Sequence, residues 1–132
     1  MRTLIVDDDD VCRTSLRIAL EPYGPIVEVV TGREAVESVR DALLADQRFD
    51  LVTLDIMMPD MDGQTALMAI RNLELVKGIA PGKGARVLMT TALNSGRSVL
   101  DAFREQCDGY LIKPLELEKL YLELSRLGLI TL

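Results

Sequence analysis

The chain of 132 residues contains no histidine. It therefore cannot carry a phosphohistidine, and it cannot build a histidine-based catalytic triad or a histidine-ligated metal site. Its two cysteines, Cys12 and Cys107, lack the Cys-x-x-Cys spacing of redox and zinc motifs. Met1 and Arg2 lead straight into an apolar segment, so we expect no secretory leader. These features predict a cytoplasmic protein with two reduced, buried thiols.

Basic side chains and long apolar runs are also scarce. The chain has 15 lysines and arginines against 21 acidic residues, a net charge of −6, which argues against a nucleic-acid-binding surface. No apolar run approaches the roughly 18–20 residues that span a bilayer, so we expect no membrane segment. The composition, 48% hydrophobic and 27% charged, is typical of a globular protein, and the length suits one domain over residues 1–132.

Short apolar segments alternate with helical patterns along the chain. Strands are predicted at residues 3–6, 26–30, 49–55, 86–90 and 109–112, and helices at about 11–20, 31–47, 64–76, 94–106 and 116–127. Connections this short allow only right-handed crossovers between parallel strands. The predicted fold class is therefore α/β, a doubly wound (βα)5 parallel five-stranded sheet of flavodoxin-like order 2-1-3-4-5.

The strand that ends at Asp55 is the centre of the predicted site. In a parallel sheet Asp7, Asp8, Thr91 and Lys113 reach the same edge as Asp55. Neighbouring carboxylates repel by on the order of 1–4 kcal/mol per pair, and an all-oxygen site with few protein ligands suits Mg²⁺. Because Lys113 and Thr91 could hold phosphoryl oxygens, the pattern favours phosphoryl transfer to a carboxylate.

Four motifs occur in order over essentially the whole chain: Leu-Ile-Val-Asp-Asp at 4–8, Leu-Asp-Ile-Met-Met-Pro-Asp-Met-Asp-Gly at 54–63, Thr-Ala at 91–92 and Tyr-Leu-Ile-Lys-Pro at 110–114. Together they resemble the receiver (CheY-like) domain of bacterial two-component response regulators, of the single-domain type. The resemblance implies a signalling switch that catalyses only its own phosphorylation and slow dephosphorylation. It also implies a sensor histidine kinase or phosphotransfer protein as one partner, and an unknown downstream protein as the other.

The same resemblance implies roles for the site residues. Asp55 would be the phosphoacceptor. Mg²⁺ would be held by Asp8, Asp55 and the backbone carbonyl of Met57, with Asp7 assisting. Lys113 would bind the phosphoryl group, and its bond to Pro114 is expected to be cis. The absence of histidine agrees with these roles, because the phosphohistidine donor must then come from another protein.

The resemblance further implies that Thr91 and Tyr110 form a switch pair, although each taken alone also suits a strand end or a core position. It places the output surface, and a homodimer contact, on the helix predicted at 94–106, the strand at 109–112 and the helix at 116–127. Phosphorylation would shift a two-state equilibrium on this surface.

Apolar residues lie on two sides of the last predicted helix. Leu120, Leu124 and Leu127 form a core stripe at helical spacing, and Leu122 and Leu129 fall on roughly the opposite side. The second pair indicates either a partner or homodimer surface, or a locally apolar surface or buried chain end. The residues alone leave both interpretations open.

Apolar residues are also expected over the phosphoryl group. Met57 and Leu93 stand two residues after Asp55 and Thr91, and neither side chain can hydrogen-bond an attacking water. We therefore expect slow self-dephosphorylation.

Other acids have simpler interpretations. Asp9 and Asp10 suit the start of a helix, and Asp60 and Asp62 are expected in a solvated loop.

Two alternative functions fit parts of the pattern. A pseudo-receiver would use the same fold as an interaction module without phosphorylation, but Asp8, Asp55, Thr91 and Lys113 are all present. A phosphotransferase with an aspartate nucleophile would act on a small molecule, but no general acid or base lies near Asp55 and no cap domain is evident. The chain could also be a fragment of a longer regulator.

Overall fold

The computed structural model describes residues 1–92 and 106–132. Its five strands form one parallel sheet in the order β2-β1-β3-β4-β5, which confirms the predicted fold class. The strands are β1 (Thr3–Val6), β2 (Ile26–Val29), β3 (Leu51–Asp55), β4 (Arg86–Ala92) and β5 (Gly109–Lys113). The helices of the described residues are α1 (Asp10–Leu20), a short 3-10 turn (Glu21–Tyr23), α2 (Gly32–Leu44), α3 (Gly63–Val76) and α5 (Leu117–Arg126).

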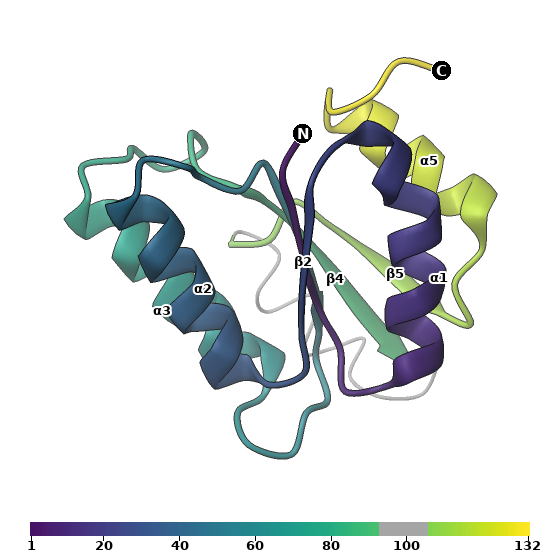
Figure 1. The fold of residues 1–132 in the computed structure, drawn as a ribbon, viewed down its shortest axis with the longest axis horizontal. Coiled ribbons are helices and arrows are strands. Elements are labelled where there is room, and N and C mark those ends of the chain that lie inside the picture. The colour runs from purple at the N-terminus through teal and green to yellow at the C-terminus, as the bar shows by residue number, and fades with distance from the viewer. Residues whose placement is uncertain (93–105) are drawn as a thin grey trace.

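Helices cover both faces of the sheet. Among the described residues, α2 and α3 pack on one face and α1 and α5 on the other (Figure 1). Each face buries its own apolar cluster: Leu4 and Val6 of β1 belong to the α2/α3 side, and Ile5 belongs to the α1/α5 side. This two-sided burial explains why the strands read as continuous apolar runs rather than alternating ones.

The alternation of side chains along a strand decides which charged residues can meet. Leu51 of β3 and Leu111 of β5 belong to the α1/α5 cluster. Because residues two apart share a face, Asp55 and Lys113 lie on that side, and so does Asp7, two residues after Ile5. Three charged side chains from three strands therefore reach one edge of the sheet on the same face.

Helices α1 and α2 each begin directly after a capping side chain. Asp9 Oδ1 accepts a hydrogen bond from the amide of Val11 at 3.0 Å, and Thr31 Oγ1 accepts from the amide of Glu34 at 3.1 Å, as predicted for these starts. Helix α2 ends at Leu44, earlier than predicted, and β4 continues to Ala92 rather than ending at residue 90. Leu93 and nearly all of the helix predicted at 94–106 lie outside the described residues.

The prediction that both thiols are buried is wrong for Cys12. Cys107 is buried, but Cys12 is only half-buried. Cys12 lies in the first turn of α1, whereas the buried residues of this helix begin at Leu16. Partial burial and a hydrogen bond from its Sγ to Asp9 Oδ2 at 3.2 Å raise the pKa of Cys12 to about 11. Its thiol is therefore protonated at neutral pH.

The two sides predicted for the last helix are only partly correct. Leu120 and Leu124 are buried, and Leu122 is 54% exposed. Leu129, however, packs against the α1/α5 cluster. Helix α5 ends before it, and Gly128 at φ 77° turns the chain, so the helical angle of 100° per residue no longer applies.

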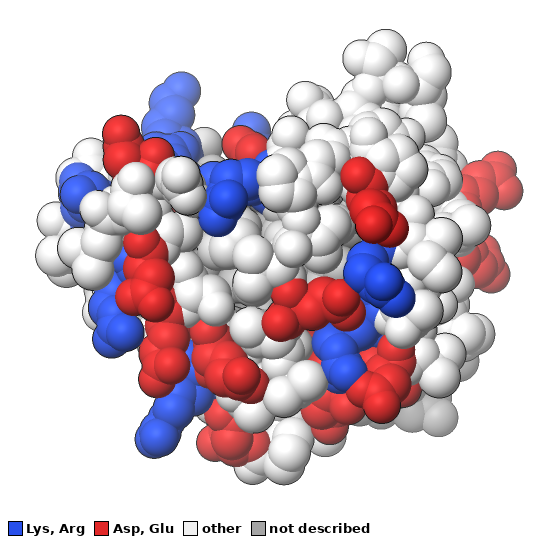
Figure 2. Space-filling model, in the orientation of Figure 1, with Lys and Arg blue, Asp and Glu red and all other residues white. Residues whose placement is uncertain are grey.

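The surface mixes charges of both signs. On the face shown in Figure 2, acidic and basic side chains are interspersed rather than gathered into separate patches. Arg13 and Arg17 of α1, for example, lie 3.8 Å and 3.3 Å from the carboxylate oxygens of Glu28 in β2. Within the described part of the chain, every helix is too short or too polar to cross a membrane.

Candidate functional site

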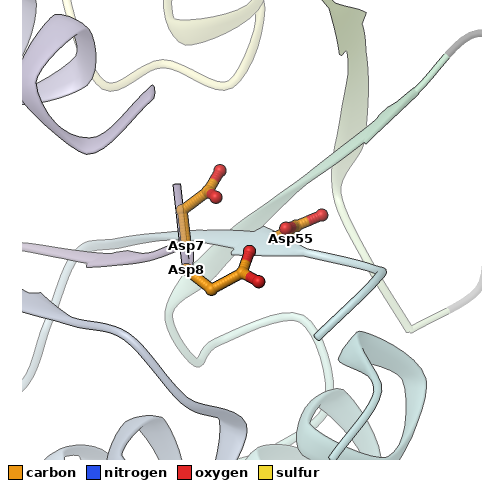
Figure 3. Close-up of side chains that lie close together, drawn as sticks. All are labelled: Asp7, Asp8 and Asp55. Atoms are coloured by element: carbon orange, nitrogen blue, oxygen red, sulfur yellow. The ribbon is translucent and has the colours of Figure 1, made fainter. Parts of the chain in front are cut away.

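Three carboxylates lie together at the C-terminal ends of β1 and β3 (Figure 3). Asp7 and Asp8 follow β1 directly, and Asp55 is the last residue of β3. One oxygen of each lies within 4.8 Å of the others. Asp7 and Asp55 are buried and Asp8 is exposed. The structure thus brings these three predicted residues together in a cluster that reaches solvent at Asp8.

Lys113, the last residue of β5, joins the cluster from a third strand. Its Nζ lies 2.9 Å from Asp7 Oδ2 and 3.4 Å from Asp55 Oδ2. Burial disfavours the ammonium charge, but the hydrogen bond to Asp7 and the charge of Asp55 outweigh it and raise the pKa of Lys113. Lys113 is therefore a permanent cation that bridges two of the acids.

Asp55 is held in an environment that disfavours its charge. Burial and the nearby charge of Asp7 raise the pKa of Asp55 to about 6, even though Lys113 and the amide of Met57 oppose the shift. The amide of Met57 donates to Asp55 Oδ1 at 3.2 Å. At neutral pH Asp55 is thus an ionised carboxylate of raised free energy, which is a suitable state for a nucleophile or a cation ligand.

The other predicted residues lie outside this cluster: Thr91 and Tyr110 on the opposite side of the sheet from Asp55, and Met57 in the loop after β3. Asp55 pairs in register with Thr90, so Thr91 points to the α2/α3 side, where it is buried and its Oγ1 donates to the Ala92 carbonyl at 3.3 Å. Tyr110 packs against the apolar cluster on the same side. The Met57 side chain is 61% exposed.

The bond between Lys113 and Pro114 is cis, as the resemblance implied.

The structure gives both acids of the loop before α3 hydrogen-bond partners that were not predicted. Asp60 accepts from the amides of Gly32 and Arg33 at 3.2 Å and 3.1 Å, and Asp62 accepts from the amide of Thr65 at 2.8 Å, which caps α3. Both are exposed, as expected. Their hydrogen bonds nevertheless attach the loop to the start of α2 and to the start of α3. An Asp before a helical run is a usual cap signal, so the role of Asp62 could have been predicted. No sequence signal pairs Asp60 with a helix 27 residues away.

Arg13 is another contact that sequence reasoning missed. Its Nη1 donates to the backbone carbonyl of Asp7 at 2.7 Å, and its guanidinium also pairs with Asp10 and lies near Glu28. A basic residue one turn into α1 therefore fixes the backbone that presents the first two acids.

The donor set fits a hard divalent cation. Three carboxylates supply only oxygen ligands, and the exposed side at Asp8 leaves room for coordinated water. Mg²⁺ prefers oxygen ligands and keeps several of its waters when bound. The predicted Mg²⁺ site therefore agrees with the chemistry of the residues present.

Comparison with known proteins identifies the family. The family model described as the response regulator receiver domain matches residues 3–125. The chain belongs to this family. Among its relatives, Chemotaxis protein CheY of Bacillus subtilis is 32% identical over 120 residues, which cover 89% of each chain. Response regulator MprA of Mycolicibacterium vanbaalenii is 36% identical over 121 residues, which cover 91% of this chain but 47% of MprA.

A solved structure shows the same architecture. The receiver domain of the histidine kinase CKI1 from Arabidopsis thaliana, complexed with Mg²⁺ and BeF3⁻, aligns with a TM-score of 0.80 and 23% identity over 96% of this chain and 89% of that one. Identity this low shows the fold alone. Receiver domains are signalling switches of two-component systems that interact with histidine kinases and downstream targets. The chain therefore belongs to a family of signalling switches.

Proposed function

We propose that this receiver accepts a phosphoryl group on Asp55 from the phosphohistidine of a partner kinase or phosphotransfer protein. The observation that carries the proposal is the position of Asp55, which ends a buried strand within 4.8 Å of two further carboxylates and 3.4 Å from the Lys113 ammonium. Burial leaves the carboxylate poorly solvated, so it gains from a cation that enters the site, and its weak solvation suits it to act as a nucleophile.

The transfer step follows from these groups. A carboxylate oxygen of Asp55 attacks the phosphorus, the phosphorus–nitrogen bond to the donor imidazole breaks, and its electron pair leaves with that imidazole. The Lys113 ammonium already bridges Asp7 and Asp55, and it can follow the phosphoryl oxygens without a change of protonation. The donor histidine lies outside residues 1–132, because these residues include none.

A bound Mg²⁺ would supply positive charge that offsets both the repulsion among the acids and the charge of the phosphoryl oxygens. Asp8, Asp55 and the Met57 carbonyl would hold it, with Asp7 assisting. The clustering of the three carboxylates in this chain supports this assignment.

The switch pair would lie on the α2/α3 side of the sheet. Thr91 and Tyr110 lie on that side of the neighbouring strands β4 and β5, where Tyr110 pairs with Met89 and Thr91 with Ile112. We propose that Thr91 moves towards the phosphoryl group while Tyr110 turns inward. The partner surface would then lie over β5, α5 and the segment between β4 and β5, and it would bind a downstream protein or a second copy of the chain. We place this signalling in the cytoplasm, within a single receiver domain over residues 1–132.

The proposal is tested by incubating the protein with Mg²⁺ and acetyl phosphate and measuring its intact mass. We expect one added phosphoryl group, and no addition without Mg²⁺ or in Asp55→Asn. Asp41→Asn serves as a matched control that removes an exposed acid of α2 and keeps Asp55. A folded protein that takes no phosphoryl group from acetyl phosphate or from cognate kinases would instead support the pseudo-receiver.

The exposed Met57 predicts how long the phosphoryl group persists. Its thioether cannot orient a water, so Met57→Asn is expected to speed phosphoryl loss by roughly tenfold, a lowering of the barrier by about 1.4 kcal/mol. The half-life of the phosphorylated form, followed by intact mass after removal of the donor, measures the change. Equal half-lives for wild type and variant would contradict this prediction.

A further inference from the structure

Asp60 joins the loop after Asp55 to the start of a distant helix. The loop, residues 56–62, connects β3 to α3. Asp60 Oδ1 accepts from the amide of Gly32 at 3.2 Å and Asp60 Oδ2 from the amide of Arg33 at 3.1 Å. These two amides open α2 and have no acceptor within their own helix. A carboxylate from the loop thus completes the N-terminus of α2.

The attachment is electrostatically favourable. The amides of Arg33 and Gly32 lower the pKa of Asp60 against partial desolvation, so the carboxylate is ionised at neutral pH. An anion at a helix N-terminus is also stabilised by the helix dipole. Thr31 Oγ1 accepts from the next free amide, that of Glu34. Asp60 and Thr31 together therefore bond the first three amides of α2.

Close packing at two glycines shows how little room the loop has. A Cβ on Gly32 would lie 2.9 Å from the Cβ and the carbonyl oxygen of Met61. A Cβ on Gly63 would lie 2.5 Å from the carbonyl oxygen of Asp55. The loop is therefore enclosed between the start of α2 and the backbone of the strand that carries Asp55.

We propose that Asp60 is a positioning residue for cation binding, because it holds the loop that carries the Met57 carbonyl. Few contacts among the described residues fix the position of Met57. Its side chain is 61% exposed, and its amide donates a hydrogen bond to Asp55 at 3.2 Å. Met58 and Met61 pack against the α2/α3 cluster, so loss of Asp60 loosens the loop without unfolding it. This inference rests on the proposed function, in which Met57 is a Mg²⁺ ligand.

The experiment compares three variants that separate loop position from helix stability. Asp60→Ala removes both acceptors, and Asp60→Asn keeps one. Thr31→Ala removes a cap of the same helix and leaves the loop contact in place. Binding of Mg²⁺ alone is followed by amide NMR titration, amide exchange is measured at Gly32 and Arg33, and phosphorylation rates from acetyl phosphate are measured over a range of Mg²⁺ concentrations.

We expect Asp60→Ala to weaken Mg²⁺ binding by about tenfold, the size usual for residues that orient metal ligands, and Asp60→Asn to weaken it less. Amide exchange at Arg33 should quicken in Asp60→Ala. The phosphorylation rate at saturating Mg²⁺ should stay within about twofold of wild type, since Asp60 does not touch the reacting atoms. Thr31→Ala should bind Mg²⁺ as the wild type does.

The inference is overturned if Asp60→Ala binds Mg²⁺ like the wild type, if Thr31→Ala weakens binding equally, or if the wild type binds no Mg²⁺. Failure of the proposed function has a different signature. In that case the wild type binds Mg²⁺ and responds to Asp60→Ala, but it gains no phosphoryl group.

Discussion

Replacing Arg71 with leucine is expected to lower the free energy of unfolding by about 3–5 kcal/mol, the cost of breaking a buried ion pair. Arg71 lies on α3, at the end of the sheet opposite Asp55. Its guanidinium donates to Glu74 at 2.8 Å, to Asp108 at 3.0 Å, and to the carbonyls of Ala85 and Gln106 at 2.8 Å each. One side chain therefore joins α3 to the chain before β4 and the chain before β5.

The main cost arises at Glu74. This carboxylate is 6% exposed, and besides Arg71 it accepts only from the amide of Ala85, at 2.7 Å, among the bonds that the structure describes. Without Arg71 it is a buried charge with no cation beside it. Asp108 is affected less, because Arg86 lies 3.3 Å from its other oxygen.

Urea unfolding at pH 7 measures the loss. Arg40→Leu is the matched control, since Arg40 forms an exposed pair with Asp41 at 3.5 Å, and such pairs contribute about 0–1 kcal/mol. A second comparison isolates the buried charge: Glu74→Gln should stabilise the Arg71→Leu variant and destabilise the wild type. The explanation fails if Arg71→Leu costs no more than Arg40→Leu, or if Glu74→Gln acts alike in both backgrounds.

The second large effect is a gain: Asp55→Asn should stabilise the metal-free protein at neutral pH by on the order of 2–3 kcal/mol. Asp55 is buried beside Asp7, and the pKa of Asp55 is raised to about 6 from an ordinary value of 3.8. Asparagine has nearly the same shape and carries no charge. Lys113 keeps its closer partner Asp7, at 2.9 Å.

The pH dependence follows from the direction of this shift. Between pH 3.8 and about 6 the folded state binds more protons at Asp55 than the unfolded state does. The contribution of Asp55 to the free energy of unfolding is therefore fully present below pH 3.8 and is lost as the pH rises through about 6. The difference in Tm between variant and wild type should widen over this range and level off above it.

Thermal unfolding followed by circular dichroism in EDTA, from pH 4.5 to 7.5, measures this difference. Added Mg²⁺ should raise the Tm of the wild type more at pH 7.5 than at pH 5, because protons compete for Asp55. It should raise the Tm of Asp55→Asn less. A constant Tm difference across this pH range would contradict the raised pKa of Asp55.

Much of this architecture was predictable because it depends on local patterns. The apolar runs before Asp7 and Asp55 had to be buried strands, and short connections forced those strands to be parallel. The C-terminal ends of parallel strands meet at one edge, so the meeting of Asp7, Asp55 and Lys113 followed from their positions in the chain. The predictions failed where a local pattern no longer applied. The prediction that Leu129 lies opposite the core stripe is wrong because Gly128 turns the chain and ends the helical period.

The sequence by itself determined the fold class, the order of the elements and the residues at the acidic edge, since each is set by the period of apolar residues and by strand polarity. Only the tertiary structure decided that Lys113 lies closer to Asp7 than to Asp55 and that Asp60 accepts from the first amides of α2. The same holds for Arg71, which joins α3 to the chain before β4 and the chain before β5. These contacts join residues far apart in the chain, and their distances depend on how whole elements pack. No local pattern contains that information.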